Sequence, residues 1–209
     1  MATRVGIVNY GMGNLGSVRR AFEDLGADVV VADRPSALDA ADRLVLPGVG
    51  AFSQGMQRLR DGGWCDALHS LVHERQRPLL GICLGMQMLA SAGDEGGDEA
   101  GLGLIAGRVR RIDALGCTLR IPHVGWNDVR FDAGEPLFAG VPDGADFYFV
   151  HSYALDAENE HDVVARTNYG VPVVAAVRHG HVFGTQFHPE KSSRCGRRLL
   201  RNFIDIAPC

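Results

Sequence analysis

The first half of the chain alternates short apolar segments with amphipathic ones, and this alternation restricts the fold more than any other feature. The apolar segments, which are typical of buried strands, are 4–10, 28–33, 42–48 and 77–83. The amphipathic segments, which have a helical period, are 15–26, 51–63 and 64–75. A repeated order of strand and helix predicts a parallel sheet that is doubly wound, with helices on both faces.

The second half of the chain has a different pattern. From about residue 102 short alternating strands are separated by turns, which indicates antiparallel pairing. The acidic, glycine-rich stretch 92–101 is expected to be an exposed loop. A final helix is expected over 193–206, and its core-facing side chains are Leu199, Leu200, Phe203 and Ile204. The prediction is one α/β domain over 1–209, a doubly wound, mainly parallel sheet with added antiparallel strands in the second half.

The composition excludes several classes of function. The chain has 209 residues, 46% of them hydrophobic, and a net charge of −4, so it can bury a full core and offers no basic surface for nucleic acid. No apolar run is long enough to span a membrane, and the first residues lack the apolar segment of a signal peptide. We therefore expect neither a nucleic acid nor a membrane as a partner.

The cysteines and histidines give little sign of a disulfide framework or a metal site. The chain has 5 cysteines and no C-x-x-C pair; their positions are 65, 83, 117, 195 and 209. An odd number of scattered cysteines suits reduced thiols and a cytoplasmic location. His69 and His73 are spaced four residues apart on a helix, but no third ligand is spaced nearby, so no metal is expected.

A glycine pattern, G-x-G-x-x-G, follows directly after the first strand, and Asp33 ends the next one. This arrangement is typical of a dinucleotide-binding loop. The other explanation is structural. Gly11 and Gly13 permit a tight turn, and Asn14 caps the helix that follows. Gly16 then lets that helix pack closely on a strand. We prefer the structural explanation because of motifs later in the chain, and it predicts no dinucleotide.

Cys83 stands between Gly81 and Gly85, where an apolar strand passes into a helix. This spacing is the cysteine form of a nucleophile elbow, in which small residues on both sides permit a sharp turn that exposes the nucleophile. The N-terminus of the helix is expected to favour the thiolate and to present the backbone N–H of Leu84 to an oxyanion. Cys83 is therefore the candidate nucleophile, and an inert, buried cysteine is the alternative.

The segment GTQFHPEKS supplies a base and a group that orients it. Pro189 favours an extended conformation for the residue before it, and along an extended segment His188 and Glu190 point to the same side. Together with the cysteine they form a candidate catalytic triad. The glycine-rich strand end PGVG offers a second oxyanion donor, the backbone N–H of Val49 or Gly50.

Taken together, GICLGMQ, PGVG and FHPEKS resemble the class I (triad) glutamine amidotransferases. The motifs NYGMGN, PHVGWN and YFVHSY narrow the resemblance to the family of glutaminase subunits of imidazole glycerol phosphate synthase. The resemblance extends from residue 4 to about 206, and no triad position departs from it. It implies a flavodoxin-like amidotransferase fold and no cofactor.

The resemblance also implies an activity and a partner. Glutamine is hydrolysed to glutamate and ammonia, with Cys83 as the nucleophile, His188 as the general acid and base, and Glu190 as its orienting group. The ammonia passes through a tunnel to a (β/α)8-barrel cyclase, which forms a heterodimer with the glutaminase and makes imidazole glycerol phosphate in histidine biosynthesis.

Two sets of residues carry over from the family. Those of the glutamine site are Gly50, Gln87, His151, Ser152 and Tyr153. Those of the cyclase interface are Asn9, Asn14, His123, Trp126 and Lys191. Lys191 is the only lysine among 21 basic residues, and we expect it to pair with an acidic residue of the cyclase.

Three alternatives stay open at this point. Another class I amidotransferase subunit, such as one serving anthranilate or purine synthesis, shares the triad but not NYGMGN and PHVGWN. A dinucleotide-dependent oxidoreductase binds NAD(P)H and has no need of Cys83. A subunit that only scaffolds its partner keeps the motifs without the chemistry. The glycines beside Val49 also permit its peptide to flip, so the oxyanion site is either preformed or completed on activation.

Overall fold

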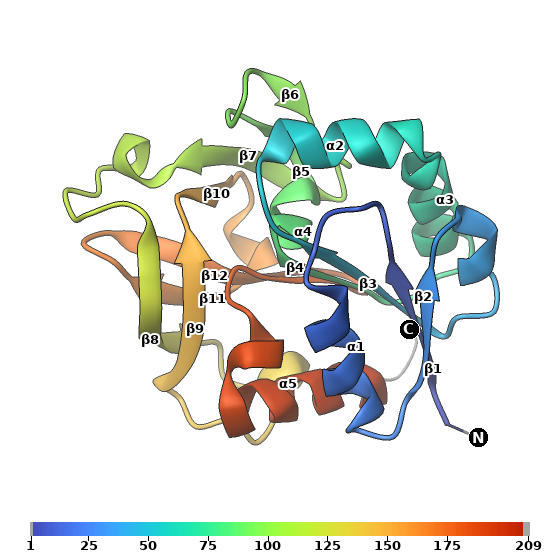
Figure 1. Cartoon of the computed structure of the whole chain (residues 1–209). Coiled ribbons are helices and arrows are strands. Elements are labelled where there is room, and N and C mark those ends of the chain that lie inside the picture. The colour runs from blue at the N-terminus through green and yellow to red at the C-terminus, as the bar shows by residue number, and fades with distance from the viewer. Residues whose placement is uncertain (1, 207–209) are drawn as a thin grey trace.

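The structure, a computed structural model, describes residues 2–206, which form a nine-stranded sheet and a smaller one (Figure 1). In spatial order, the parallel half of the large sheet consists of β2 (Asp28–Ala32), β1 (Arg4–Val8), β3 (Arg43–Gly48), β4 (Leu79–Cys83) and β13 (Val182–Thr185). The antiparallel half continues with β12 (Pro172–His179), β11 (Val163–Asn168), β8 (His123–Phe131) and β9 (Ala145–His151). Both predicted halves of the sheet are thus confirmed.

Helices cover both faces of the parallel half, as a doubly wound sheet requires (Figure 1). One face carries α1 (Leu15–Glu23) and α5 (Ser193–Asp205). The other carries α2 (Phe52–Asp61), α3 (Trp64–His69), which continues as a π turn (Ser70–Glu74), and α4 (Leu84–Met88). Short 3-10 turns are Pro35–Leu38, Ile112–Leu115, Pro136–Phe138, Glu160–Asp162 and Pro189–Lys191. Within residues 2–206, no helix has the length and apolar character needed to cross a membrane.

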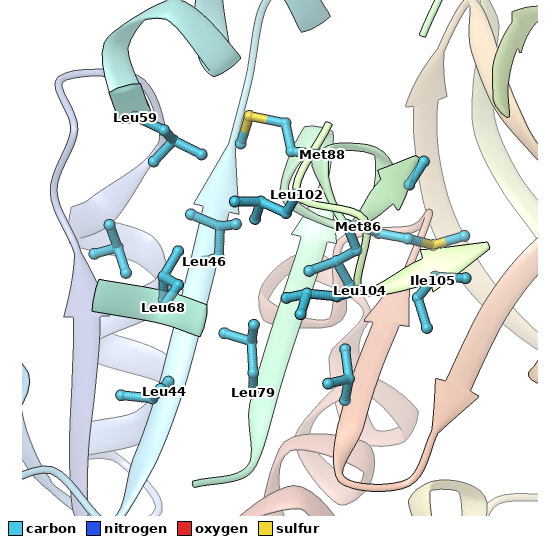
Figure 2. Close-up of a cluster of buried hydrophobic side chains, with 14 of the residues drawn as sticks. Leu44, Leu46, Leu59, Leu68, Leu79, Met86, Met88, Leu102, Leu104 and Ile105 are labelled. Atoms are coloured by element: carbon cyan, nitrogen blue, oxygen red, sulfur yellow. The ribbon is translucent and has the colours of Figure 1, made fainter. Parts of the chain in front are cut away.

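Each face of the sheet has its own apolar core, because side chains alternate between the two faces along a strand. On β3, Leu44 and Leu46 belong to the core under α2 and α3, whereas Val45 belongs to the core under α1 and α5. Figure 2 shows the first of these cores, in which Leu79 of β4 and Leu59 of α2 lie with the β3 leucines. Each such buried side chain contributes roughly 1.5–3 kcal/mol.

The last helix packs as its sequence predicts. The four side chains expected to face the core are buried, and they are Leu199, Leu200, Phe203 and Ile204. The Phe203 ring meets the Phe22 ring of α1 edge-on, with 6.4 Å between centroids. Packing between α1 and α5 therefore anchors the C-terminal helix on the parallel half of the sheet.

A second, four-stranded sheet corrects one prediction. In spatial order it consists of β10 (Tyr153–Ala157), β7 (Ile105–Arg111), β5 (Ala90–Gly93) and β6 (Glu99–Ala100). The stretch 92–101 is therefore not a plain exposed loop, because Ala92 pairs with Ala100 across a hairpin. Small and acidic residues give no apolar alternation, so the backbone pairing left no signal in the sequence.

The loop after β1 has the predicted turn but not the predicted packing. Gly11 and Gly13 have φ of 82° and 143°, values that favour glycine. The Asn14 side chain accepts a hydrogen bond from the backbone N–H of Ser17 at the start of α1, as expected of a helix cap. The role given to Gly16 is wrong: it is exposed, and a Cβ atom there would meet nothing within 4 Å.

Candidate active site

Cys83 occupies a strained turn between β4 and α4. Its φ and ψ are 55° and −111°, a left-handed conformation that is rare for a residue with a side chain. A Cβ atom at Gly81 would lie 2.7 Å from the carbonyl oxygen of Gly85, and one at Gly85 would lie 1.7 Å from that of Leu46. The two glycines are thus required by close backbone approach, which is the geometry of a nucleophile elbow.

The ends of β3 and β4 bring the candidate oxyanion donors together. Gly48 pairs with Cys83 in the parallel register, and Val49 follows directly, with 42% of its surface exposed. Gly50 has a φ of 114°, and Leu84 is the first residue of α4. Because α4 has only 5 residues, its dipole is smaller than the sequence suggested. A neighbouring base is therefore needed beside the helix N-terminus to activate the thiol.

His188 and Glu190 supply that base and its orienting group. His188 Nδ1 lies 2.8 Å from Glu190 Oε1, and the two side chains are 2% and 1% exposed. The carboxylate accepts the Nδ1–H, which leaves Nε2 for the thiol of Cys83. Burial lowers the pKa of His188, but the adjacent Cys83 and Glu190 raise it more strongly, to a net value of about 9. An imidazolium beside a cysteine stabilises the thiolate.

A pocket of about 600 Å³ opens at the carboxyl ends of the parallel strands, where ligands bind in sheets of this kind. It brings together most of the residues singled out from the sequence. Those that line it are Val49, Gly50, Cys83, Leu84, Gln87, His151, Ser152, Tyr153 and His188. Its remaining lining residues are Ala51, Glu95, Pro122 and Val150. Glu190 stands behind His188 and does not line this pocket.

Gln186 contacts the nucleophile and was missed by the sequence reasoning. It is fully buried, and its Nε2 donates to Cys83 Sγ over 3.8 Å. Its Oε1 accepts a hydrogen bond of 3.0 Å from Gln87 Nε2, which also donates to the carbonyl oxygen of Tyr153 at 2.8 Å. The signal was available, because Gln186 precedes His188 by two residues and so points to the same side of an extended segment.

Glu95 was missed because the stretch around it gave no sign of structure. Its Oε2 accepts a hydrogen bond of 3.0 Å from the backbone N–H of Phe52, at the start of α2, and its side chain lines the pocket. The pKa of the Glu95 carboxyl is raised, because burial disfavours the charge more than the Phe52 hydrogen bond favours it. The pocket thus holds a carboxyl group in addition to the two imidazoles of His151 and His188.

Comparison with known proteins decides the family. The class-I glutamine amidotransferase family matches residues 6–207. The chain belongs to this family. It is 48% identical, over 202 residues, to the imidazole glycerol phosphate synthase subunit HisH of Moorella thermoacetica, with 97% of this chain and 94% of that protein covered. To HisH of Halobacterium salinarum it is 50% identical over 206 residues, which cover 95% and 91% of the two chains. Within the amidotransferases, the chain belongs to the HisH group.

Solved structures agree on the fold. A glutamine amidotransferase crystal structure superposes with a TM-score of 0.76 at 24% identity, over 96% of this chain and 97% of that one. PurLQS from Thermotoga maritima superposes with a TM-score of 0.75 at 20% identity, over 98% and 99%. At these identities the likeness shows the amidotransferase fold alone. The fold class predicted from the sequence is therefore confirmed.

The amidotransferase has an exposed apolar surface beside the pocket. The side chains of Val124 and Trp126 on β8, and Val150 on β9, are 55%, 53% and 37% exposed, and Val124 pairs with Val150 across the two strands. Tyr148 pairs with Trp126, and Lys191 holds its Nζ 5.9 Å from the Tyr148 ring. We call Val124, Trp126, Tyr148 and Val150 the β8–β9 face.

His123 does not lie on this face, and its expected surface position is wrong. It is 2% exposed, because alternate residues of β8 point to opposite sides and His123 points inward. Its ring stacks on Phe149 and Tyr169, with 4.8 and 4.0 Å between centroids. The motif PHVGWN therefore contributes both an exposed residue, Trp126, and a buried one.

The loop that resembles a dinucleotide fingerprint uses its acidic residue internally. Asn9 Nδ2 donates to Asp33 Oδ1 at 2.6 Å, and Asn9 Oδ1 accepts from the backbone N–H of Gly11 at 3.1 Å. Asn9 is half-buried with both ends of its amide engaged, whereas Asn14 is exposed. The carboxylate that a nucleotide ribose would require is thus bound to the loop's own asparagine.

Three of the other cysteines do not line the pocket. Cys65, Cys117 and Cys195 are free thiols, and Cys209 lies outside the described residues. Over the part of the chain that the structure describes, no group of at least 3 histidine, cysteine or acidic side chains is arranged to hold a metal ion. His69 of α3 and His73 of the π turn that continues it stack on each other, with 5.5 Å between ring centroids.

Proposed function

We propose that this chain is the glutaminase subunit of an imidazole glycerol phosphate synthase. The observation that carries the proposal is the triad: Cys83 in a strained elbow, at one pocket with His188, which is held by Glu190 at 2.8 Å. The full-length similarity to HisH subunits supports the same function, and it disfavours the oxidoreductase and the other amidotransferase subunits. The substrate is glutamine, and the ammonia released serves a partner subunit.

In the first half of the reaction, the proton of the Cys83 thiol is held on His188 Nε2, and the thiolate attacks the side-chain carbonyl carbon of glutamine. The resulting oxyanion accepts hydrogen bonds from the backbone N–H of Leu84 and of Val49. His188 then gives its proton to the amide nitrogen, the C–N bond breaks, and ammonia leaves a thioester. Glu190 keeps the imidazole in the required tautomer and stabilises its protonated form.

In the second half, His188 accepts a proton from a water molecule, which attacks the thioester carbon. The C–S bond breaks, the Cys83 sulfur recovers its proton from His188, and glutamate leaves. Val150 belongs both to the pocket and to the β8–β9 face, and this supports a route for ammonia toward a partner docked on that face.

Glu95 is suited to bind the α-ammonium of the substrate. Glutamine carries this positive charge at the end opposite its reacting amide, and Glu95 places a carboxylate in the pocket with one oxygen already held by the Phe52 N–H. A charge-assisted hydrogen bond of this kind contributes about 1.5–3 kcal/mol.

Glu95→Gln should therefore raise KM for glutamine by roughly 10- to 100-fold while kcat changes little, because the lost interaction is the same in the ground and transition states. The amide oxygen can still accept from Phe52, so the hairpin stays in place. The matched control is Glu99→Gln in the same hairpin, where the acid pairs with Arg60 and does not line the pocket. An unchanged KM in Glu95→Gln would remove the acid from substrate binding.

The partner we propose is a (β/α)8-barrel cyclase that docks on the β8–β9 face. This face is apolar, exposed and adjacent to the pocket, since Val150 belongs to both. The exposed Lys191 borders it, and a groove that includes Lys191 extends to Ser17 near the cap residue Asn14. We propose further that residues 1–209 act as one amidotransferase domain and that it works in the cytoplasm, where reduced cysteines are stable.

Lys191→Met should weaken binding of the cyclase by about tenfold and reduce its stimulation of glutaminase activity, because methionine keeps the apolar stem and removes the charge. The comparison is Arg75→Met, a charge removed before the amino end of β4, at the far end of the sheet from the pocket. Titration of each variant with the cyclase, followed by ammonia release, measures both effects. Equal affinity and stimulation in Lys191→Met would exclude the proposed ion pair.

The function itself is tested by glutamine turnover with and without the cyclase and the cyclase's own substrate, which the family resemblance implies is a phosphoribulosyl carboxamide nucleotide. We expect glutamate release to rise on addition of both, and imidazole glycerol phosphate to form with glutamine as the nitrogen source. A complex with the cyclase that releases no glutamate, or turnover stimulated only by a chorismate-using partner, would refute the proposal.

A further inference from the structure

Two buried histidines from two different motifs are hydrogen-bonded to each other beneath the pocket. His123 Nδ1 lies 2.9 Å from His151 Nε2, and the residues are 2% and 6% exposed. The far nitrogen of His151, Nδ1, lies 2.9 Å from the carbonyl oxygen of Tyr153. The far nitrogen of His123, Nε2, lies 3.3 Å from Nδ2 of Asn127. A continuous chain of hydrogen bonds, which we call the relay, thus runs from β8 to the lining of the pocket through Asn127, His123, His151 and Tyr153.

We propose that this relay positions the segment His151–Tyr153 for glutamine, with His123 as a positioning residue that does not itself reach the substrate. The inference rests on the proposed function, since it concerns the same pocket. The motif PHVGWN would then have two roles: His123 acts inside the subunit, and Trp126 lies on its exposed face.

The direction of every hydrogen bond in the relay is determined. The carbonyl oxygen of Tyr153 only accepts, so the proton of His151 is on Nδ1. In a neutral ring this leaves His151 Nε2 as an acceptor, and His123 must donate to it from Nδ1. His123 Nε2 is then bare and accepts from the Asn127 amide. With both imidazoles neutral, each therefore carries its single proton on Nδ1.

Asn127 closes the relay at its other end. Its Nδ2 also donates to the carbonyl oxygen of Asn168 at 2.9 Å, and its Oδ1 accepts from the Asp128 N–H at 3.0 Å, so the amide cannot be reversed. If His151 were protonated, its Nε2–H would donate to His123 Nδ1, and the proton of His123 would have to lie on Nε2. The His123 Nε2–H would then point at the Asn127 N–H, so that two hydrogen-bond donors would face each other. Burial also opposes protonation, since it lowers the pKa of His123 to about 4 and that of His151 to about 3.

The relay ends on an atom that organises the pocket. The Tyr153 carbonyl oxygen accepts both from His151 and from Gln87 Nε2, at 2.8 Å. Gln87 is bonded in turn to Gln186, whose amide reaches Cys83 Sγ. A shift of the Tyr153 carbonyl would therefore displace both a pocket-lining amide and a neighbour of the nucleophile.

His123 is held so that its donor keeps one direction. Its ring lies between Phe149 and Tyr169, at interplanar angles of 20° and 22°. Two functions, stacking and donation, are thus combined in one side chain, and substitutions can separate them. Phenylalanine keeps a ring for the stack and removes the donor. Asparagine removes the ring and places an amide N–H close to the position of Nδ1–H.

The first test measures glutamine kinetics of the two variants in the assembled synthase. We expect His123→Phe to raise KM by about tenfold with kcat within about threefold of the parent, because the pocket segment is no longer fixed. His123→Asn should keep KM within about threefold even though its Tm falls. His181→Phe is the control. His181 also makes a partly buried hydrogen bond, to the Val72 carbonyl oxygen at 2.8 Å, but it does not line the pocket. An unchanged KM in His123→Phe, or an equal rise in both variants, would overturn the positioning role.

The second test observes the protons directly. Nitrogen-15 spectra of histidine rings in the full chain, assigned with His123→Asn and His151→Asn, should show both rings neutral with Nδ1–H at pH 7. A proton on Nε2 of His151, or a doubly protonated ring, would overturn the relay. This measurement does not depend on catalysis. If the parent synthase hydrolysed no glutamine, the proposed function would be refuted, but the spectra would still show whether the two rings have the protonation that the relay requires.

Discussion

Cys83→Ala is expected to lower glutamine hydrolysis by about four orders of magnitude or more, the loss seen when the nucleophile of a covalent mechanism is removed. The change deletes the sulfur that forms the thioester and leaves the backbone turn in place. Alanine at a φ of 55° is no more strained than cysteine, so the fold should survive. Ammonia release in the presence of the cyclase measures the loss, and synthesis with added ammonium salt should stay normal.

Cys65→Ala is the matched control for this variant. Cys65 is a free, half-buried thiol on α3, and it does not line the pocket. The Cys65→Ala variant should therefore hydrolyse glutamine at the parental rate. If Cys83→Ala still supported glutamine-dependent synthesis, the subunit would be a scaffold and the triad assignment would be wrong.

Gly85→Ala is expected to destabilise the fold by more than about 4 kcal/mol, which places it among the most damaging single substitutions. The new Cβ atom would lie 1.7 Å from the carbonyl oxygen of Leu46 and 2.8 Å from its carbon. Neither atom can move without separating β3 from β4, because Leu46 belongs to the β3–β4 ladder. Urea unfolding, or the yield of soluble protein where the variant does not fold, measures the effect.

Gly16→Ala makes the same chemical change where there is space. A Cβ atom there meets nothing within 4 Å, and the residue is in the first turn of α1, so alanine should stabilise the protein by up to about 1 kcal/mol. We therefore expect the change in the free energy of unfolding to have opposite signs in Gly85→Ala and Gly16→Ala. A Gly85→Ala variant that unfolded at the same urea concentration as the parent would mean that the turn around Cys83 is not as closely packed as described.

The residues that sequence reasoning found share a local signal. The glycines around Cys83 and the proline between His188 and Glu190 report backbone geometry within a few residues of the reacting groups. Such geometry is required wherever the segment sits, so it can be derived without knowing the fold. The alternation of strands and helices likewise fixed the parallel half of the sheet, since each element buries its apolar side over its own length.

The residues that were missed or misplaced depend on contacts between distant segments. Glu95 enters the pocket because β5 and β6 pair beside α2, and small or acidic strands leave no periodic pattern. His123 is buried because β8 pairs with β9 and turns alternate residues inward, a register that the single strand does not reveal. Gly16 was given a packing role that only the helix position could test.

Lys191 has a practical consequence for observing assembly. It is the only lysine, and so the only side-chain amine, in the sequence, and it is exposed beside Tyr148. An amine-reactive dye can therefore be attached to one defined side chain at the margin of the proposed docking surface, without introducing a new cysteine, once the α-amine of the chain has been blocked. A short amine-to-carboxyl cross-linker at the same position would identify, by mass spectrometry of the joined peptides, the acidic residue of the cyclase that lies opposite.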